Sequence, residues 1–322
     1  METKKLLEVN NLFMHFPIKG NEVVHAVDGV SFFVNEGETL GIVGESGCGK
    51  STLARCLVRI YKPTSGEIIF NDTDIASLNH KQLKPFRKDI QMVFQDPYAS
   101  LDARMVVHDI ISEPLYAQGI VKNHKQADEY VTKLLKEVGL SAEHAGRYPH
   151  EFSGGQRQRI GIARALVLSP KLVICDEPIS ALDVSIQAQI VNLLSSFQKQ
   201  QKLTYIFIAH DLSMVRYVSD RVGVMYLGKM VELCSSEEIY NAPLHPYTIG
   251  LLNSIPIADP KHNKINSDPI SGDIPSPVHP PSGCRFHTRC PYAKDICTKT
   301  EPELIDSGDN HLVACHFPVH QN

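Results

Sequence analysis

Two patterns of hydrophobic residues alternate along the chain. Short, nearly continuous apolar runs are typical of strands buried in a sheet, and they predict strands at residues 39–43, 90–94, 172–176, 204–209 and 221–226. Segments in which apolar residues recur every three or four positions are typical of helices. They predict helices at residues 50–60, 154–168, 185–200 and 212–218. Strands that alternate with helices favour an α/β fold with a mainly parallel sheet.

Two segments depart from this alternation. Residues 106–139 have a helical pattern without a strand, which predicts an inserted helical subdomain. After about Pro243 the composition changes, and prolines recur from Pro256 to Pro291 among Gly, Ser and Asp residues. Because proline fixes φ and lacks a backbone donor, we expect this tail to be extended and irregular. It is poor in apolar residues, so we expect a small appendix, bounded near residues 234–243, that needs help to fold.

Composition disfavours several classes of function. The net charge is −4, so nothing indicates the basic surface of a nucleic-acid-binding protein. The first residues do not resemble a signal peptide, and no apolar run approaches the roughly 18 residues of a membrane helix. We therefore expect a cytosolic protein that acts at a membrane only through a partner.

A glycine-rich motif follows the first of these strands. Residues 44–51 match a phosphate-binding loop, with an apolar strand before them and a helical pattern after them. The glycines let backbone N–H groups turn toward phosphate oxygens, and the helix start adds a positive dipole. A chance glycine-rich turn would lack this strand and helix. We expect Lys50 to reach the β- and γ-phosphates and Ser51 to bind Mg²⁺. The nucleotide-contacting set here is Gly44, Glu45, Ser46, Gly47, Cys48, Gly49, Lys50, Ser51 and Thr52.

Two acidic residues end a later apolar strand. Asp176 and Glu177 stand at the carboxyl end of this strand, where open α/β sheets bind ligands. Asp176 suits Mg²⁺ binding, directly or through water, and Glu177 suits polarising the attacking water. Taken alone, such a pair would more simply be a solvated strand end. The phosphate loop upstream is what favours the catalytic interpretation.

A third motif begins a helix. Ser153, Gly154, Gly155 and Gln156 are followed by an amphipathic pattern, and small residues at a helix start expose N–H groups to an anion. By itself this motif would be only a flexible cap. What favours a functional role is its position in the chain, before the strand at residues 172–176.

Together, in this order, these motifs resemble the nucleotide-binding domain of ABC transporters over about residues 5–235. The resemblance implies a P-loop NTPase (RecA-like) core with a helical subdomain at about 96–165 and an antiparallel β subdomain. It places this domain at residues 1–235 and a small irregular extension at 236–322. It also implies roles for Gln95 of the Q-loop, Asp183 of the D-loop (residues 180–183) and the switch histidine His210. Phe16 stands where the family places an aromatic residue against adenine, although Phe13 and His15 are near.

Further stretches resemble the ATPases of dipeptide and oligopeptide importers. These stretches are residues 149–159, 180–189, 225–229, 245–248 and 272–284. Within that family the chain is similar to the second ATPase of a heterodimeric pair. Because the family also imports nickel, glutathione and other small solutes, the resemblance leaves the solute open.

Four cysteines lie in the tail: Cys284, Cys290, Cys297 and Cys315. None form a pair two to four residues apart, as zinc sites usually have, and the ferredoxin spacings do not match either. Spacing therefore leaves zinc, an iron–sulfur cluster and four ordinary thiols open. The family resemblance implies a [4Fe-4S] cluster, with Zn²⁺ as the alternative. We expect Cys290→Ser to disorder the tail while sparing nucleotide binding at Lys50.

The resemblance implies an ATPase that works as a dimer, with ATP between the phosphate loop of one subunit and the 153–156 motif of the other. It implies catalytic roles for Glu177, His210 and Gln95, and Mg²⁺ binding by Ser51, Gln95 and Asp176. The implied partners are a second ABC ATPase, two transmembrane permease subunits contacted by residues 96–115, and, through the permease, an extracytoplasmic solute-binding protein. The chain would then be peripheral, on the cytoplasmic face of the cell membrane.

Two other classes of protein explain the same residues less well. A soluble ABC-type ATPase of translation or DNA repair would usually have tandem motif sets or long heptad arms, and neither is present. A redox or metal-sensing module built on the four tail cysteines would leave the ATPase motifs unexplained.

Overall fold

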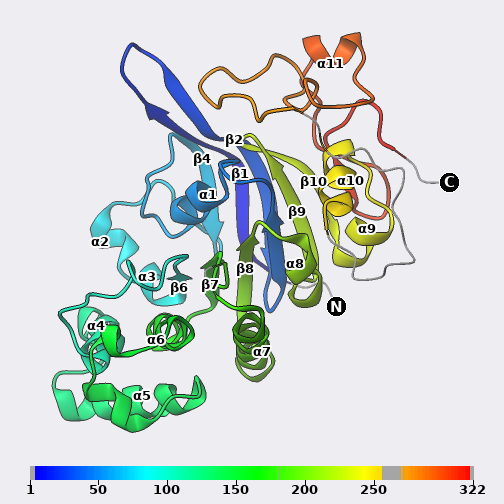
Figure 1. Ribbon diagram of the computed structural model, residues 1–322. Helices are drawn as coiled ribbons and strands as arrows, with labels where there is room; N and C mark the ends of the chain where they lie inside the picture. The colour runs from blue at the N-terminus through cyan, green and yellow to red at the C-terminus, as the bar shows by residue number, and fades with distance from the viewer. Residues whose placement is uncertain (1–3, 181, 256–269, 271, 320–322) are drawn as a thin grey trace, which may run out of the picture. The chain divides into compact units, whose positions relative to one another are not determined.

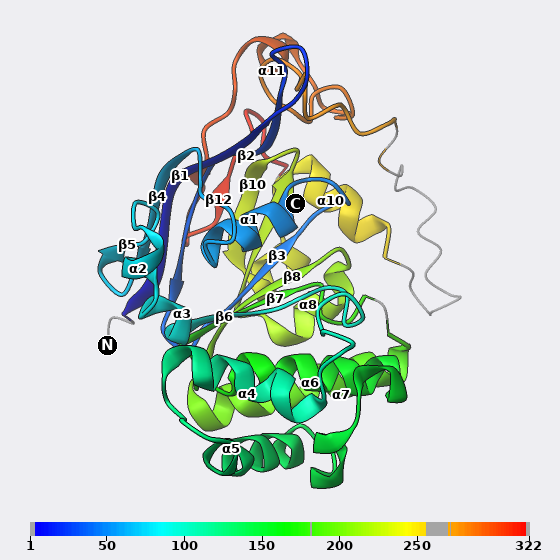
Figure 2. The same cartoon turned by 90° about the vertical axis from the view of Figure 1, so that its left-hand side faces the viewer.

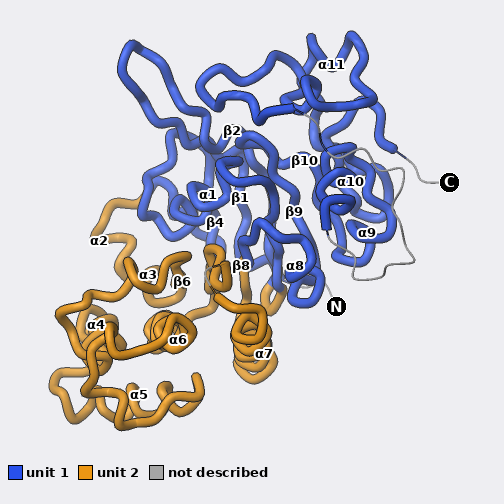
Figure 3. Tube along the Cα trace, in the orientation of Figure 1, with its two compact units in different colours: residues 1–35, 39–77, 207–322 blue, residues 36–38, 78–206 orange. Residues whose placement is uncertain are grey.

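The computed structural model describes residues 4–180, 182–255, 270 and 272–319, so that Ala181 of the D-loop and residues 256–269 and 271 of the proline-rich segment lie outside it. The chain divides into two compact units (Figure 3). The first unit comprises Met1–Asn35, Thr39–Ser77 and Phe207–Asn322, and the second comprises Glu36–Glu38 and Leu78–Ile206. We describe each unit by itself.

An antiparallel sheet in the first unit is formed by β1 (Lys5–Pro17), β2 (Val23–Asn35), β4 (Ser65–Phe70) and β5 (Thr73–Asp74), in the order β2-β1-β4-β5. Along β2, Val30, Phe32 and Val34 are buried and alternate with partly exposed residues, as expected of a sheet with one face in the core. The family resemblance implied this sheet, whereas the strand pattern did not predict it.

The first unit also contains strands of the eight-stranded sheet, including the strand before the phosphate loop. Here β3 (Thr39–Val43) pairs in parallel with β9 (Arg221–Tyr226), and β9 pairs antiparallel with β10 (Lys229–Ser235). Beyond β10 lie β12 (Leu312–Val313) and β11 (Ile305–Asp306). The helices are α1 (Lys50–Leu57), α8 (Leu212–Val218), α9 (Ser236–Asn241), α10 (Pro246–Asn253) and α11 (Asp295–Lys299). Figure 1 shows α9 and α10 on the side of β10.

Parallel strands and a group of helices make up the second unit. The strands are β6 (Ile90–Val93), β7 (Leu172–Asp176) and the first half of β8 (Thr204–Ala209), in the order β8-β7-β6. Two short helices, α2 (His80–Leu83) and α3 (Phe86–Asp89), precede β6. The longer helices are α4 (Val107–Gln118), α5 (His124–Glu137), α6 (Gly154–Leu166) and α7 (Val184–Gln201), with 3-10 turns at Ala142–Gly146 and Pro149–Glu151. Helices α4, α5 and α6 pack on one another (Figure 2).

Four of the predicted strands have the observed bounds: 39–43 is β3, 172–176 is β7, 204–209 is β8 and 221–226 is β9. The helical pattern at 106–139 corresponds to α4 and α5. None of the described helices combines the length and the hydrophobicity needed to cross a membrane.

The tail is more ordered than its composition suggested. It contributes β11, α11 and β12, and β12 pairs with the edge of β10. Phe286 is buried, with its ring 5.3 Å from that of Tyr226 and 5.4 Å from that of Tyr247. Most of the described residues 272–319 nevertheless lie outside helices and strands, as expected of an irregular extension. The tail uses apolar surface of the first unit, which composition alone cannot reveal.

Candidate nucleotide site

The phosphate loop joins buried β3 to α1, and two of its glycines are required by close backbone contacts. Gly44 has φ +154°, and a Cβ there would lie 2.2 Å from the carbonyl oxygen of Met225. Gly49 has φ +105°, and a Cβ there would lie 2.0 Å from the carbonyl oxygen of Ala26. Any larger residue would push the loop away from β9 and β2. Ser46 and Gly47, between them, are exposed.

Lys50 begins α1 and lies back over the loop. Its side chain is buried, and its Nζ donates to the carbonyl oxygens of Gly44 at 2.7 Å and Glu45 at 3.0 Å. The same Nζ lies 3.7 Å from Cys48 Sγ. Burial raises the pKa of the Cys48 thiol, although the Lys50 charge opposes that shift, so Cys48 stays a neutral thiol beside a cation. The ammonium is thus held at the mouth of the loop, where an anion would meet it.

In the second unit, Gln95 and Glu177 are brought together by strand pairing. β6 and β7 run parallel with Val93 opposite Cys175, so the residues that follow each strand lie at the same edge. There Gln95 Nε2 donates to Glu177 Oε2 at 2.8 Å. Glu177 has φ +44°, an uncommon backbone conformation for a residue other than glycine and one often found at functional sites. Asp176 is only 1% exposed.

The 153–156 motif forms the start of α6. Ser153 Oγ accepts from the backbone N–H of Gln156, and Gln156 Oε1 accepts from the N–H of Ser153, so the two residues form a capping box. A Cβ on Gly155 would lie 2.6 Å from Ile186 Cγ2, so α6 approaches α7 closely there. The helix start remains accessible, since Ser153 is exposed and the next three residues are partly exposed.

The remaining predicted residues are divided between the units. In the first, the Phe16 ring lies edge-on to that of Tyr61, just past α1, at 5.4 Å, and His210 is exposed after β8. Ser51 and Thr52, in the first turn of α1, are partly exposed. In the second unit, Asp183 is the N-cap residue of α7. The phosphate loop, Phe16 and His210 thus belong to the first unit, and Gln95, Asp176 and Glu177 to the second.

The four tail cysteines line one small pocket. The other residues that line it are three histidines, one proline and three aromatic residues: His245, His287, His316, Pro246, Phe286, Tyr292 and Phe317. Burial, together with the charges of neighbouring cysteines, raises the pKa of Cys284 and of Cys315 to about 11. Burial likewise raises the pKa of Cys290, and Cys284 and Cys297 add to the effect. The thiols are therefore close enough to repel one another when ionised.

Sequence reasoning missed two residues that contact the phosphate loop. Tyr247 Oη accepts from the backbone N–H of Glu45 at 2.8 Å. Arg289 donates to both carboxylate oxygens of Glu45, from Nη1 at 2.7 Å and from Nη2 at 3.0 Å. In the sequence, residues 245–248 stand out only through the family resemblance. Nothing in the sequence marks Arg289 as a contact of the loop except its place next to Cys290. These contacts argue against the expectation, drawn from the sequence, that Cys290→Ser would disorder the tail and still spare nucleotide binding.

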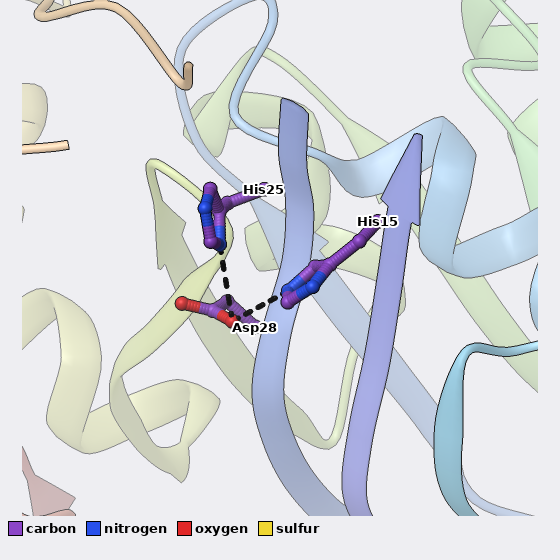
Figure 4. Close-up of side chains that lie close together, drawn as sticks. All are labelled: His15, His25 and Asp28. Atoms are coloured by element: carbon purple, nitrogen blue, oxygen red, sulfur yellow. Dashed lines mark hydrogen bonds and ion pairs between the residues drawn. The ribbon is translucent and has the colours of Figure 1, made fainter. Parts of the chain in front are cut away.

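A charged cluster in the first unit joins β1, β2 and the tail. His15 Nε2 lies 2.8 Å from Asp28 Oδ1, and His25 Nδ1 lies 3.7 Å from the same oxygen (Figure 4). Asp28 also pairs with Arg285 and, at 3.8 Å, with Lys229. Burial would raise the pKa of Asp28, but the His15 hydrogen bond and these two cations lower it overall. Because Arg285 and Lys229 already balance this carboxylate, the cluster does not require a metal ion.

One large cavity in the described chain lies away from the predicted nucleotide residues. Its volume is about 760 Å³, and it lies between β1 and the tail, with Asn10, Phe33 and Glu303 among its lining residues. Of the predicted site residues only Cys284 touches it. Cavity volume alone therefore does not identify the nucleotide site.

Comparisons with known proteins agree with this geometry. Residues 27–180 match the ABC transporter family, and residues 231–297 match the oligopeptide/dipeptide transporter C-terminal region. The chain is 54% identical to the oligopeptide transport ATP-binding protein AppF of Bacillus subtilis (strain 168), covering 97% of each chain. It is 50% identical to the oligopeptide transport ATP-binding protein OppF of Escherichia coli (strain K12), covering 97% of this chain and 96% of that one.

Solved structures of ABC-type proteins are also similar to this chain. A dimeric post-hydrolysis state of the ATP-binding cassette MJ0796, bound to ADP and Pi, is similar with a TM-score of 0.66 and 27% identity, over 71% of this chain and 98% of that one. The protein cbiO1 from Clostridium perfringens, part of an ABC transporter complex, is similar with a TM-score of 0.64 and 31% identity, over 74% of this chain and 91% of that one. Taken with the near-full-length identities of 50–54%, these matches show that the chain belongs to the oligopeptide transport ATP-binding proteins, the ATP-hydrolysing subunits of ABC transporters.

Proposed function

We propose that this chain binds Mg²⁺–ATP at residues 44–52 and hydrolyses it to drive import of di- or oligopeptides, or of a related small solute. The geometry of the phosphate loop is the main support for this proposal. Gly44 and Gly49 leave no room for a side chain, and the Lys50 ammonium donates to the Gly44 and Glu45 carbonyl oxygens and lies near Cys48 Sγ. When phosphates replace those two carbonyls as partners of Lys50, the ammonium stays buried and paired. The peptide substrate is suggested by the names of the relatives.

The proposed chemistry is positioning and charge stabilisation of the transferring phosphoryl group. Lys50 contacts the β- and γ-phosphates, and Ser51, Gln95 and Asp176 would hold Mg²⁺, which neutralises phosphate charge when it is bound. Glu177 polarises the attacking water, and Gln95 orients the Glu177 carboxylate through their hydrogen bond. The nearly complete burial of the Asp176 carboxylate at a strand end suits a cation ligand.

His210 and Phe16 complete the proposed half-site. His210 contacts the γ-phosphate, and Phe16 stacks on the adenine. Phe16 is supported by its ring contact with Tyr61, just past the helix that begins with Lys50. The partly exposed start of α6, with Ser153, Gly154, Gly155 and Gln156, offers N–H groups to the ATP bound by a partner subunit. Asp183 would lie beside that partner.

The proposed assembly is a heterodimer with a second ABC ATPase, bound to two transmembrane permease subunits and served by an extracytoplasmic solute-binding protein. The chain would be peripheral, at the cytoplasmic face of the membrane. Residues 96–115 would contact the permease. Contacts within the second unit support a coupling role for this segment, because Arg157 of α6 lies over the Tyr98 ring at 3.9 Å and Arg164 donates to the Ser100 carbonyl at 2.6 Å. A movement of α6 would therefore be passed to residues 98–100.

We also propose that Cys284, Cys290, Cys297 and Cys315 hold a [4Fe-4S] cluster with a structural or regulatory role. Such a cluster would tie together segments from three parts of the tail. Four sulfurs around one zinc ion at about 2.3 Å would lie roughly 3.8 Å apart. Among the described residues, the sets of three or more possible ligand atoms within 4.8 Å of one another do not include these cysteines. Because the four thiols line one pocket, they can supply the four thiolate ligands of such a cluster.

The ATP site is tested by equilibrium binding of Mg²⁺–ATP to the full chain. We expect Lys50→Ala to weaken binding by at least tenfold, because a charge-assisted contact to the phosphates is lost. Lys299→Gln, an exposed cation in α11, is the control and should bind as the wild type does. Wild-type protein that fails to bind, or Lys50→Ala that binds equally well, would refute the proposed site.

A further inference from the structure

The contact between the tail and the phosphate loop is made by buried, charged groups. The Arg289 side chain is 5% exposed and the Glu45 side chain 25% exposed, and two parallel hydrogen bonds join them. Bidentate arginine–carboxylate pairs are strong and fix orientation as well as distance.

On the tail side of this contact, Arg289 is held in place by aromatic residues. The Arg289 guanidinium lies 5.8 Å from the Tyr226 ring, and the Tyr226 ring packs on those of Tyr247 and Phe286. Tyr247 reaches the same loop residue, since it accepts the Glu45 N–H. Glu45 is therefore held at its carboxylate by one tail residue and at its backbone by another.

The charge of Glu45 explains why this contact matters for nucleotide binding. Glu45 stands one residue after Gly44, within the loop that meets the phosphates. An uncompensated carboxylate there would repel an incoming polyphosphate and would draw Lys50 away from it. Arg289 neutralises the carboxylate and holds it against the tail.

From these contacts we propose that Arg289 is a positioning residue for ATP binding: it neutralises and orients Glu45, so that the tail sets the affinity of the phosphate loop for ATP. The inference rests on the proposed ATP site. Since Arg289 directly precedes Cys290, any rearrangement of the cysteine pocket acts on the same contact.

A charge-rescue experiment tests this role by calorimetric titration of Mg²⁺–ATP into the full chain. Arg289→Gln should weaken binding about tenfold, because Glu45 loses its counter-charge. Arg289→Lys should give an intermediate loss, since lysine keeps the charge but not the two-pronged geometry. The double variant Glu45→Gln/Arg289→Gln should recover most of the affinity, because the repulsive charge is gone. Arg87→Gln, the same change at an exposed arginine, is the control and should bind as the wild type does.

The rescue separates positioning from simple damage to the fold. Loss of tail structure alone would not be repaired by removing the Glu45 charge, so an equally weak double variant would overturn the proposal. Wild-type affinity in Arg289→Gln would overturn it as well. If Arg289→Gln does not fold, Arg289→Lys carries the test, and binding equal to wild type would count against the proposal. Lys50→Ala in the same series distinguishes the two failures, because a normal Lys50 effect with no Arg289 effect leaves the ATP site intact.

Discussion

Two acidic residues that are neighbours in the chain have different surroundings. Asp176 is almost completely buried at the end of β7, whereas Glu177 is partly exposed, adopts a positive φ and accepts a hydrogen bond from Gln95. A buried carboxylate suits a cation, and a partly exposed one can reach a water molecule. The environment therefore supports assigning Mg²⁺ binding to Asp176 and water activation to Glu177.

Glu177→Gln tests that assignment. The variant keeps shape and volume but removes the carboxylate that polarises water, so we expect Mg²⁺–ATP binding to persist and a closed dimer to accumulate. Hydrolysis at this site should fall by about 10²- to 10⁴-fold, the usual contribution of a general base. Phosphate release by the purified transporter measures the effect, with the exposed Glu129→Gln as control. Full turnover would mean that this site is silent and the partner's site does the work.

At the scale of elements, α10 is tied to the sheet by a buried polar group at its start. His245 is 1% exposed, and its Nδ1 accepts the backbone N–H of Tyr247 at 3.1 Å as the N-cap of α10. Glu232 of β10 accepts the N–H groups of Leu244 and His245 and pairs with His311 of the tail at 2.7 Å. One carboxylate thus joins β10, α10 and the tail, and it places Tyr247 against the phosphate loop.

Stability should fall in acid because of this cap. Burial lowers the pKa of His245 to about 4, below its unfolded value of about 6.5. Between those values the unfolded chain binds the extra proton, so the free energy of unfolding decreases as the pH falls from about 6.5 toward 4. We expect a loss of roughly 2 kcal/mol from this group between pH 7 and pH 5.

Urea unfolding at the two pH values measures that loss. His245→Asn keeps an N-cap acceptor but does not titrate, so it should show a smaller difference between pH 7 and pH 5. An equal difference in both proteins would contradict the His245 explanation.

At the scale of the whole molecule, the sequence carries one phosphate loop and one 153–156 motif, so the proposed shared ATP site needs a second ATPase subunit. We expect the purified transporter to contain one copy of this chain and one copy of a related ATPase, together with two permease subunits. Quantitative mass spectrometry of the intact complex gives the ratio. Two copies of this chain and no second ATPase would contradict the heterodimer.

The tail should also contain metal. Anaerobic purification should yield about four irons and four sulfides per chain. One zinc per chain would replace the cluster assignment and keep the stabilising role of the four cysteines. Cys290→Ser should lose the metal and, because Arg289 is adjacent, should also weaken ATP binding. The absence of any metal from an ordered tail would mean that these are ordinary thiols.

The phosphate loop and α6 could be predicted because their determinants are local. An apolar strand, glycines at fixed spacing and Lys50 at the helix start fall within a short stretch, and the Ser153–Gln156 capping box spans four residues. The pairing of Gln95 with Glu177 was not explicit in the sequence, although both strands were predicted. It required the parallel register of β6 and β7.

The tail shows what only the tertiary structure decided. Glu45 and Tyr247 are 202 residues apart in the chain, and Glu45 and Arg289 are 244 apart. No periodicity or motif links positions so distant, and the order of the tail depends on apolar surface supplied by β9 and β10 as well as on its own composition. The sequence alone determined the ATPase motifs because each is built from neighbouring residues, whereas the contact of the tail with the phosphate loop exists only after remote segments have packed together.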